Sequence, residues 1–186
     1  MTFQKTTIPG LLIFEPKVME DERGCFFESY NEKIFQQAGL AINGVQDNQS
    51  SSTYGVIRGL HYQLNPHAQA KLIRVIAGKI QDVVVDIRKN SPAYGKSFCI
   101  ELSDENKKQL FIPAGFAHGF SVLSEKAIVI YKCDSFYNKE SEAGILYNDP
   151  ALQIDWKLPA DIAIVSEKDC LLPPLATCRN NFVFEN

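Results

Sequence analysis

Short runs of alternating apolar and polar residues follow one another along most of the chain, separated by turn-forming residues. Alternation of this kind is typical of strands with one buried face, because successive side chains of a strand point to opposite faces. It predicts strands over residues 11–18, 25–30, 55–63, 71–77, 79–88, 97–102, 109–113, 119–123 and 127–133. Many short strands at this spacing predict a mostly β, antiparallel jelly-roll barrel.

Three segments have features beyond simple alternation. Residues 80–87 are almost continuously apolar at their centre, which predicts a strand covered on both faces. The dipeptide Ala77-Gly78 lies between this segment and the preceding predicted strand, and we interpret it as the tip of a hairpin that joins the two. Residues 45–48, Val-Gln-Asp-Asn, supply amide donors and acceptors but by themselves predict only a polar loop.

We expect helices to be few, short and peripheral. Residues 32–38 place apolar side chains on one face, with Asn31 as a possible N-cap and Gly39 able to end the helix in a left-handed conformation. A second helical piece is expected at 159–163. Because no internal repeat, linker or low-complexity tract divides the sequence, we expect residues 1–186 to form a single domain.

The composition is that of a soluble globular protein, with 186 residues, 45% hydrophobic and 22% charged. No apolar run approaches the roughly 18 residues of a membrane span, and the N-terminus lacks the layout of a signal peptide. The net charge of -3 gives no general attraction for nucleic acid or anionic membranes. We therefore expect neither nucleic acid nor a membrane as a partner.

The cysteine pattern points to a reducing compartment. The chain has five cysteines, an odd number, and they are widely scattered without a Cys-x-x-Cys pair. This spacing argues against both a disulfide framework and a structural zinc site. The sequence therefore favours a cytoplasmic protein.

The predicted strand at 55–63, Gly-Val-Ile-Arg-Gly-Leu-His-Tyr-Gln, carries the first candidate chemistry, because His61 and Arg58 lie on it. A positioned histidine titrates near neutral pH, and an arginine offers a planar donor fork to phosphate or carboxylate. Residues three apart point to opposite faces of a regular strand. A shared site therefore requires a bulge or twist, which we predict near Gly59, a residue type that tolerates one.

A lone histidine is more often a structural residue, but further groups strengthen a catalytic reading. Lys71 begins a neighbouring predicted strand, and His118 follows a turn. Asp169 offers a carboxylate that could orient the His61 imidazole. Tyr131 shares strand parity with apolar neighbours, so the pattern alone favours a core aromatic with its hydroxyl at the rim.

A metal site must be weighed, because residues 113–118 match Pro-x-Gly-x-x-His, the second half of the cupin metal signature. The first half requires a His-x-His pair, whereas His61 is followed by Tyr-Gln and His67 lies in a predicted solvated loop. These unpaired imidazoles do not readily supply three protein ligands. We therefore predict a cupin-like jelly roll without a metal.

Ordered segments along almost the whole chain, from residue 8 to about residue 175, share a family pattern. They are residues 21–28, 45–48, 55–63, 69–72, 82–88, 111–120, 131–132, 148–150 and 166–169. Any one could arise by chance, whereas their common order would not. In this order they resemble the dTDP-4-dehydrorhamnose 3,5-epimerase family.

The resemblance implies a cofactor-free inversion of C3 and C5 of dTDP-4-dehydro-6-deoxy-D-glucose, giving dTDP-4-dehydro-L-rhamnose in dTDP-L-rhamnose biosynthesis. It implies His61 as the base, with Asp169 orienting its imidazole. Lys71 would stabilise the enolate, and Tyr131 would act as the acid on the opposite face. Electrostatic stabilisation of this kind is often the largest single contribution to catalysis.

The resemblance also implies residues that bind the dTDP-4-keto-6-deoxyhexose substrate. They are Arg23, Phe26, Glu28, Gln46, Asp47, Asn48, Arg58, Lys71, His118, Tyr137, Glu142 and Lys168. Arg23 and Arg58 suit a diphosphate on charge grounds, and Phe26 and Tyr137 could pack against the thymine ring. Family members are usually homodimers in which N-terminal segments can pair across subunits.

Three other functions remain open at this point. The first is a related epimerase that inverts only C3 or only C5 of a dTDP-4-keto-deoxysugar. The second is a metal-dependent cupin oxygenase or isomerase, and the third is a non-catalytic sugar-nucleotide binder. Exchange of substrate hydrogens with solvent separates the epimerases from the binder and from each other, and metal content identifies the cupin enzyme.

Overall fold

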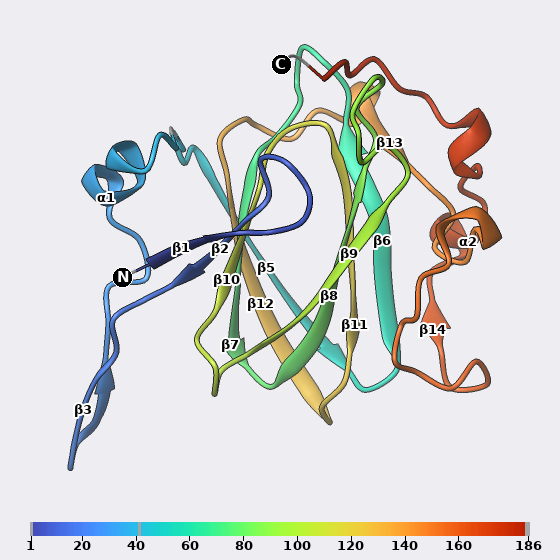
Figure 1. The fold of residues 1–186 in the computed structure, drawn as a ribbon. Coiled ribbons are helices and arrows are strands. Elements are labelled where there is room, and N and C mark those ends of the chain that lie inside the picture. The colour runs from blue at the N-terminus through green and yellow to red at the C-terminus, as the bar shows by residue number, and fades with distance from the viewer. Residues whose placement is uncertain (1, 41, 185–186) are drawn as a thin grey trace.

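The computed structural model describes residues 2–40 and 42–184, and two large sheets make up most of it (Figure 1). The first sheet is entirely antiparallel. In spatial order its strands are β1 (Thr2–Lys5), β2 (Leu12–Glu15), β10 (Gln109–Ile112), β7 (Lys71–Ala77), β12 (Lys126–Cys133) and β5 (Gln46–Thr53).

The second sheet faces the first. In spatial order it contains β13 (Glu142–Gly144), β6 (Val56–Gln63), β11 (Phe116–Val122), β8 (Lys79–Asp86) and β9 (Ser97–Ser103). These strands are antiparallel, while the short β14 (Ile164–Val165) adds to β6 in parallel. A separate hairpin of β3 (Met19–Asp21) and β4 (Gly24–Phe26) projects away from both sheets (Figure 1).

The helices are short and lie outside the sheets. They are α1 (Glu32–Gln37), α2 (Glu167–Cys170) and the 3-10 turns η1 (Lys139–Ser141), η2 (Pro150–Leu152) and η3 (Leu175–Thr177). In the described part of the chain, no helix is both long and apolar enough to cross a membrane. The helix α2 lies beside β6 and β14, on the side of the second sheet away from the first (Figure 1).

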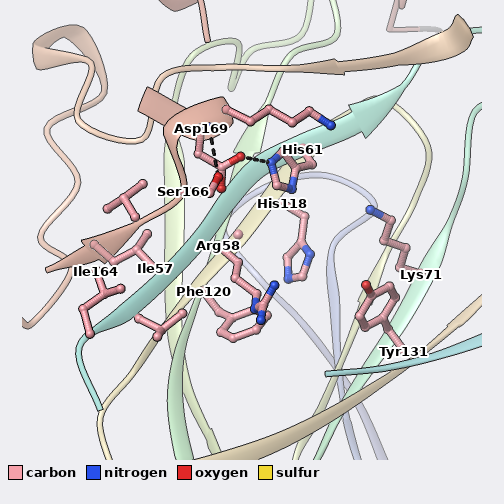
Figure 2. A pocket seen from close by; sticks show the side chains of 14 residues that line it. Ile57, Arg58, His61, Lys71, His118, Phe120, Tyr131, Ile164, Ser166 and Asp169 are labelled. Carbon is pink, nitrogen blue, oxygen red and sulfur yellow. Dashed lines mark hydrogen bonds and ion pairs between the residues drawn. The ribbon is translucent and has the colours of Figure 1, made fainter. Parts of the chain in front are cut away.

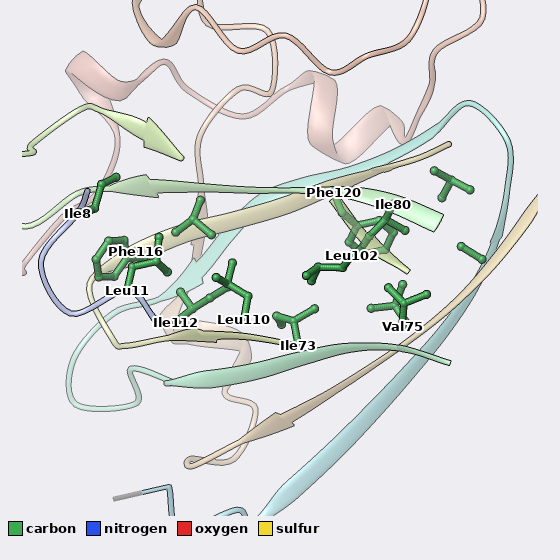
Figure 3. Close-up of a cluster of buried hydrophobic side chains, with 14 of the residues drawn as sticks. Ile8, Leu11, Ile73, Val75, Ile80, Leu102, Leu110, Ile112, Phe116 and Phe120 are labelled. Atoms are coloured by element: carbon green, nitrogen blue, oxygen red, sulfur yellow. The ribbon is translucent and has the colours of Figure 1, made fainter. Parts of the chain in front are cut away.

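The main core fills the space between the two sheets (Figure 3). The first sheet contributes Ile73, Val75, Leu110 and Val129, and the second contributes Ile80, Val84, Leu102 and Phe120. Burying each such side chain stabilises the fold by roughly 1.5–3 kcal/mol. A second cluster covers the outer face of β6 and β8, so β8 is buried on both sides, as its continuous apolar centre predicts.

The predicted fold class is confirmed: the protein is mostly β, with facing antiparallel sheets and short peripheral helices. Strand β7 has the predicted bounds, and the other predicted strands are present with shifted ends, the run at 25–30 stopping at Phe26. The first helix is also confirmed. Asn31 accepts a hydrogen bond from the Lys33 amide, and Gly39 adopts a φ of 78°.

The predicted hairpin at Ala77-Gly78 is wrong. Strand β7 pairs with β10 and β12 in one sheet, whereas β8 pairs with β11 and β9 in the other. The chain crosses between the sheets at Gly78, where a Cβ would lie 2.0 Å from the Lys126 carbonyl oxygen. Gly78 is therefore a corner at which the chain passes from one sheet to the other. It is the single residue between β7 and β8, whereas a tight hairpin turn needs two.

Two other local predictions are also wrong. Residues 46–53 form the edge strand β5, which pairs with β12 along its whole length. The polar side chains of this segment do not indicate a strand, because the hydrogen bonds that form the ladder come from backbone groups. Residues 159–163 form a turn followed by β14, and the C-terminal helix α2 begins later, at Glu167.

The predicted irregularity near Gly59 is confirmed. The pairing of β6 with β11 shifts register between His118 and Phe120, which face His61 and Arg58 respectively. Gly59 has a φ of 123°, and a Cβ on it would lie 2.5 Å from the Cα of Gly119. The extra residue in β6 changes the alternation, so Arg58 and His61 face the same hollow.

We expect Gly59→Ala to destabilise the protein more than Gly24→Ala. Both glycines have φ near 120°, so alanine at either position carries backbone strain on the order of 1–3 kcal/mol. Gly24 has open space where a Cβ would lie, whereas Gly59 meets Gly119, and the overlap adds about 1–3 kcal/mol. Thermal unfolding of both variants measures the difference. Equal losses of stability would contradict the close approach.

Candidate active site

A hollow of about 490 Å³ opens between the two sheets and is lined by charged and aromatic side chains (Figure 2). The second sheet contributes Arg58 and His61 from β6 and His118 from β11. The first sheet contributes Lys71 from β7 and Tyr131 from β12. Five predicted site residues, scattered between positions 58 and 131, therefore meet in one place.

The His61 imidazole is fixed by a carboxylate behind it. Its Nε2 atom lies 2.7 Å from Oδ1 of Asp169, and the aspartate side chain is 6% exposed while the histidine side chain is 34% exposed. The helix α2 presents this carboxylate, and Ser166 caps the helix by accepting a hydrogen bond from the Asp169 amide. The histidine therefore has one nitrogen held and an open face toward the hollow.

Burial alone would raise the pKa of the Asp169 carboxyl, but its partners lower it below the usual value. The hydrogen bond and charge of His61 contribute most to the lowering, followed by the hydrogen bonds from the Gly59 amide and Ser166. The carboxylate is therefore ionised at neutral pH. The buried negative charge of Asp169 therefore lies directly against the His61 ring.

The opposite wall carries a phenol and an ammonium group. Burial raises the pKa of the Tyr131 hydroxyl, with Cys133 adding to the shift and Arg58 opposing it, so the phenol is protonated at neutral pH. Burial also lowers the pKa of the Lys71 ammonium, against the charges of Cys133 and Asp82. The hollow thus has an imidazole–carboxylate pair on one wall and a proton-bearing phenol on the other.

A second hollow, of about 320 Å³, adjoins the first and shares His61, Lys71 and Tyr131 with it. Its other predicted lining residues are Gln46, Asn48, Tyr137 and Glu142. The Tyr137 hydroxyl donates to Glu142 at 3.0 Å, and Lys168 donates to the other oxygen of the same carboxylate at 2.7 Å. These exposed polar side chains form a rim around the deeper groups.

Four predicted substrate-binding residues lie outside both hollows. Arg23 and Phe26 belong to the projecting hairpin β3–β4, where Arg23 pairs with Asp21. Glu28 accepts a hydrogen bond from Asn31 near the start of α1, and Asp47 pairs with Lys132 on the outer face of β5. Within one chain, these side chains do not reach the His61 imidazole.

Asp82 is not among the predicted site residues, although its carboxylate lies 2.8 Å from Nε2 of His118. A usable signal was present, because Asp82 shares strand parity with the buried Ile80 and Val84 and so interrupts an apolar face. Gln63 and Gln69, which line the second hollow, were also missed. Their polar side chains carry no distinctive spacing.

The arrangement of ligand-type side chains does not resemble a metal centre. Among the described residues, no group of three or more His, Cys, Asp or Glu side chains is placed to hold a metal ion. The two buried carboxylates near the hollow are each paired with an imidazole instead. The chemistry that the described side chains support is proton transfer combined with binding of an anion.

Comparison with known proteins gives a consistent picture. The profile of the dTDP-4-dehydrorhamnose 3,5-epimerase family matches residues 5–177. The dTDP-4-dehydrorhamnose 3,5-epimerase of Shigella flexneri is 55% identical over 170 residues, which cover 91% of this chain and 93% of that protein. The range matched by the family profile includes all the residues that line the hollow.

Solved structures agree. The crystal structure of the dTDP-4-dehydrorhamnose 3,5-epimerase of Elizabethkingia anophelis has a TM-score of 0.90 and 54% identity, covering 94% of this chain and 96% of that one. The dTDP-6-deoxy-D-glucose-3,5-epimerase of Legionella pneumophila, in complex with dTDP-4-keto-L-rhamnose, has a TM-score of 0.90 and 47% identity. That match covers 95% of this chain and 93% of the other.

We expect Asp169→Asn to lower thermal stability at neutral pH, and we expect the loss of stability to be smaller at acidic pH. The folded state holds the pKa of the Asp169 carboxyl below its ordinary value of 3.8, so it favours the ionised form. Its contribution to stability is therefore present above pH 3.8 and is lost as the pH falls through the lower folded-state pKa. Thermal unfolding from pH 7 to pH 3 measures this change.

The exposed carboxyl of Asp161 provides the matched control. We expect the unfolding midpoint of Asp161→Asn to follow that of the wild type at every pH. The gap between wild type and Asp169→Asn should instead narrow toward acid. A gap that stays constant across the pH range would show that ionisation of the Asp169 carboxyl does not stabilise the fold.

Proposed function

The chain belongs to the dTDP-4-dehydrorhamnose 3,5-epimerase family, and on that premise we propose that it inverts C3 and C5 of dTDP-4-dehydro-6-deoxy-D-glucose. The product is dTDP-4-dehydro-L-rhamnose, an intermediate of dTDP-L-rhamnose biosynthesis. The observation that carries the proposal is the placement of His61 and Tyr131 on opposite walls of one hollow. A base and an acid on opposite faces are what inversion of a carbon centre requires.

The reaction begins with removal of a proton from carbon. The hydrogens on C3 and C5 are weakly acidic because both carbons flank the C4 carbonyl. His61 takes the proton, the C–H electron pair forms a carbon–carbon double bond, and the carbonyl electrons move to the C4 oxygen. Asp169 stabilises the resulting imidazolium through its 2.7 Å contact with Nε2. No cofactor is needed for these steps.

The negative charge on the C4 oxygen needs a positive partner. Lys71 extends into the hollow near His61 and Tyr131 (Figure 2). Burial lowers the pKa of its ammonium group, against the charges of Cys133 and Asp82. The same exclusion of water strengthens the attraction between the charged form and a developing oxyanion. We therefore assign enolate stabilisation to Lys71.

Inversion is completed from the other wall. Tyr131 donates its proton to the carbon on the face opposite His61, and the pKa of its hydroxyl, raised by burial, keeps that proton in place until then. Solvent then returns a proton to the phenolate, and His61 releases its own. The cycle is carried out once at each of the two carbons.

The remaining predicted residues would bind the nucleotide. Arg58 lines the hollow, held by a 3.0 Å hydrogen bond from its Nε to Ser52, and suits a phosphate. Gln46 and Asn48 on β5 present amides to the second hollow, beside Tyr137. An exposed tyrosine at this rim offers a ring for stacking on thymine.

We further propose that the protein is a homodimer in which the β3–β4 hairpin of one chain completes the site of its partner. Arg23 and Phe26 are exposed on this hairpin, and Phe26 has 66% of its surface accessible. The family resemblance gives both residues a role in substrate binding, yet neither lines the hollow of its own chain. A hairpin that projects from the body can reach a neighbouring subunit (Figure 1).

A cytoplasmic location is also proposed. All five cysteines are free thiols, and three of them, Cys25, Cys99 and Cys170, are exposed. Exposed free thiols persist where glutathione and thioredoxin keep them reduced.

Exchange of substrate hydrogens with heavy water tests the proposed reaction. The purified protein should introduce deuterium at both C3 and C5 of dTDP-4-dehydro-6-deoxy-D-glucose, as followed by NMR, because each inversion passes through an enolate. Labelling at one carbon alone would indicate a single-position epimerase. Tight binding without labelling would indicate a non-catalytic binder.

Two variants test the assigned roles. His61→Ala should reduce exchange by about 10²–10⁴-fold while dTDP affinity is retained, and His67→Ala, which changes an exposed loop histidine, should have no effect. Tyr131→Phe should impair inversion more than exchange, because His61 can still remove a proton and return a deuteron on its own face. Full exchange in His61→Ala would mean that another group is the base.

Mixing two variants, each impaired in a different way, tests the shared site at a substrate concentration well below the KM of Arg23→Ala. Arg23→Ala should raise KM by weakening phosphate binding, and His61→Ala should remove the base. If the hairpin acts on the partner, mixed dimers contain one site with an intact His61 and an intact Arg23, so mixing restores activity. Sedimentation should show a dimer. Mixed dimers that remain inactive would place the action of Arg23 within its own chain.

A further inference from the structure

A second carboxylate–imidazole pair, whose imidazole lines the same hollow, is more deeply buried than the first. The Nε2 atom of His118 is 2.8 Å from Oδ2 of Asp82, and their side chains are 8% and 0% exposed. His118 on β11 is the direct register partner of His61 on β6. Asp82 lies on the next strand, β8, opposite Phe120. The mechanism described above gives Asp82 no role.

The hydrogen bonds of Asp82 do not account for its burial. Its second oxygen, Oδ1, is buried and has no hydrogen-bond partner among the described residues. Asp86, four residues further along the same strand, differs, because Arg88 and Ser91 donate hydrogen bonds to its carboxylate oxygens. A half-satisfied buried carboxylate destabilises a fold, so Asp82 calls for another explanation.

The charge of Asp82 acts on both walls of the hollow. Burial raises the pKa of its carboxyl, and the charges of His118 and Lys71 oppose the increase. In return, Asp82 favours the charged form of the Lys71 ammonium, which burial disfavours. Asp82 on the second sheet is therefore coupled to Lys71 on the first.

We propose that Asp82 is a positioning residue of the epimerisation site, which fixes the His118 imidazole through Nε2. With Nε2 engaged, Nδ1 of His118 is left for the ligand, in the same hollow as the Lys71 ammonium (Figure 2). The two groups then share the C4 oxygen of the sugar. The identity of that oxygen depends on the proposed function, whereas the pairing of Asp82 with His118 does not.

The chemical reason lies in the two nitrogens of an imidazole. A carboxylate accepts a hydrogen bond but cannot donate one, so Asp82 requires a proton on Nε2 of His118. That requirement fixes both the tautomer of the neutral ring and its orientation. Without it, the ring could rotate or place its proton on Nδ1, and the contact with substrate would change.

Nuclear magnetic resonance of the substrate-free protein tests the pairing directly. The chain has three histidines, so their ring ¹⁵N signals can be assigned by single substitutions. We expect a proton on Nε2 of His118 in the wild type, and a shift of both its ring nitrogens in Asp82→Asn with His67 unchanged. Unchanged His118 signals in Asp82→Asn would overturn the proposal, whatever reaction the protein catalyses.

Kinetics test the functional consequence. We expect kcat of Asp82→Asn to fall by about 10–100-fold, the range typical for a residue that orients a functional group, with KM changed less than threefold. Asp149→Asn is the control, because Asp149 is also buried but caps backbone amides at Ala151 and Leu175. It should lower thermal stability and leave kcat of the folded enzyme unchanged. If Asp82→Asn likewise lowered thermal stability and left kcat unchanged, Asp82 would have only a structural role and the proposal would be overturned.

A double variant asks whether Asp82 acts through His118. If it does, adding Asp82→Asn to His118→Gln should reduce kcat by much less than it does in the wild type. Losses that simply multiply would overturn the proposal. Absence of hydrogen exchange in the wild type would instead refute the proposed function, and the resonance experiment would still decide whether Asp82 positions His118.

Discussion

The site depends on one close approach between two backbone segments, at Gly59 on β6 and Gly119 on β11. A Cβ on either residue would come within 2.6 Å of backbone atoms of the other strand, so the two strands meet as only glycines can. The extra residue that β6 carries there turns both Arg58 and His61 into the hollow. The Gly59 amide also donates to Asp169. One backbone irregularity thus orients the proposed phosphate ligand Arg58, the proposed base His61 and the carboxylate behind it.

The two-sheet architecture then gives the hollow chemically different walls. On the second sheet, the Nε2 atom of His61 is held by the ionised carboxylate of Asp169. On the first sheet, burial raises the pKa of the Tyr131 hydroxyl and lowers that of the Lys71 ammonium. In the proposed mechanism, a ligand held between these walls meets the proton acceptor His61 on one face and the proton donor Tyr131 on the other. The proposed direction of proton transfer therefore follows from which sheet each residue belongs to.

Local signals made much of the fold predictable, and non-local contacts explain the remainder. Strand β7 and the Asn31-capped helix follow from side-chain pattern and capping, which act over a few residues. The edge strand β5 was missed because its backbone hydrogen bonds depend on β12, which lies far away in the sequence. The corner at Gly78 was missed because the position of a strand in the sequence does not reveal which sheet it joins. Asp82 was missed because its partner lies 36 residues away. The bulge was predictable because the spacing of two functional residues conflicted with strand periodicity.

The arrangement of charges reconciles an acidic chain with an anionic ligand. The net charge is -3, yet the side chains that open onto the hollow include Arg58 and Lys71. The acidic groups Asp82 and Asp169 are 0% and 4% exposed and lie behind imidazoles, so they act on the ligand only through those rings. In the proposed mechanism, the positive charge that His61 gains with a proton is balanced by the Asp169 carboxylate already in contact with it. The negative charge that this mechanism places on the sugar oxygen meets cations on the side that faces it, so each charge created by the proposed reaction has a partner in place.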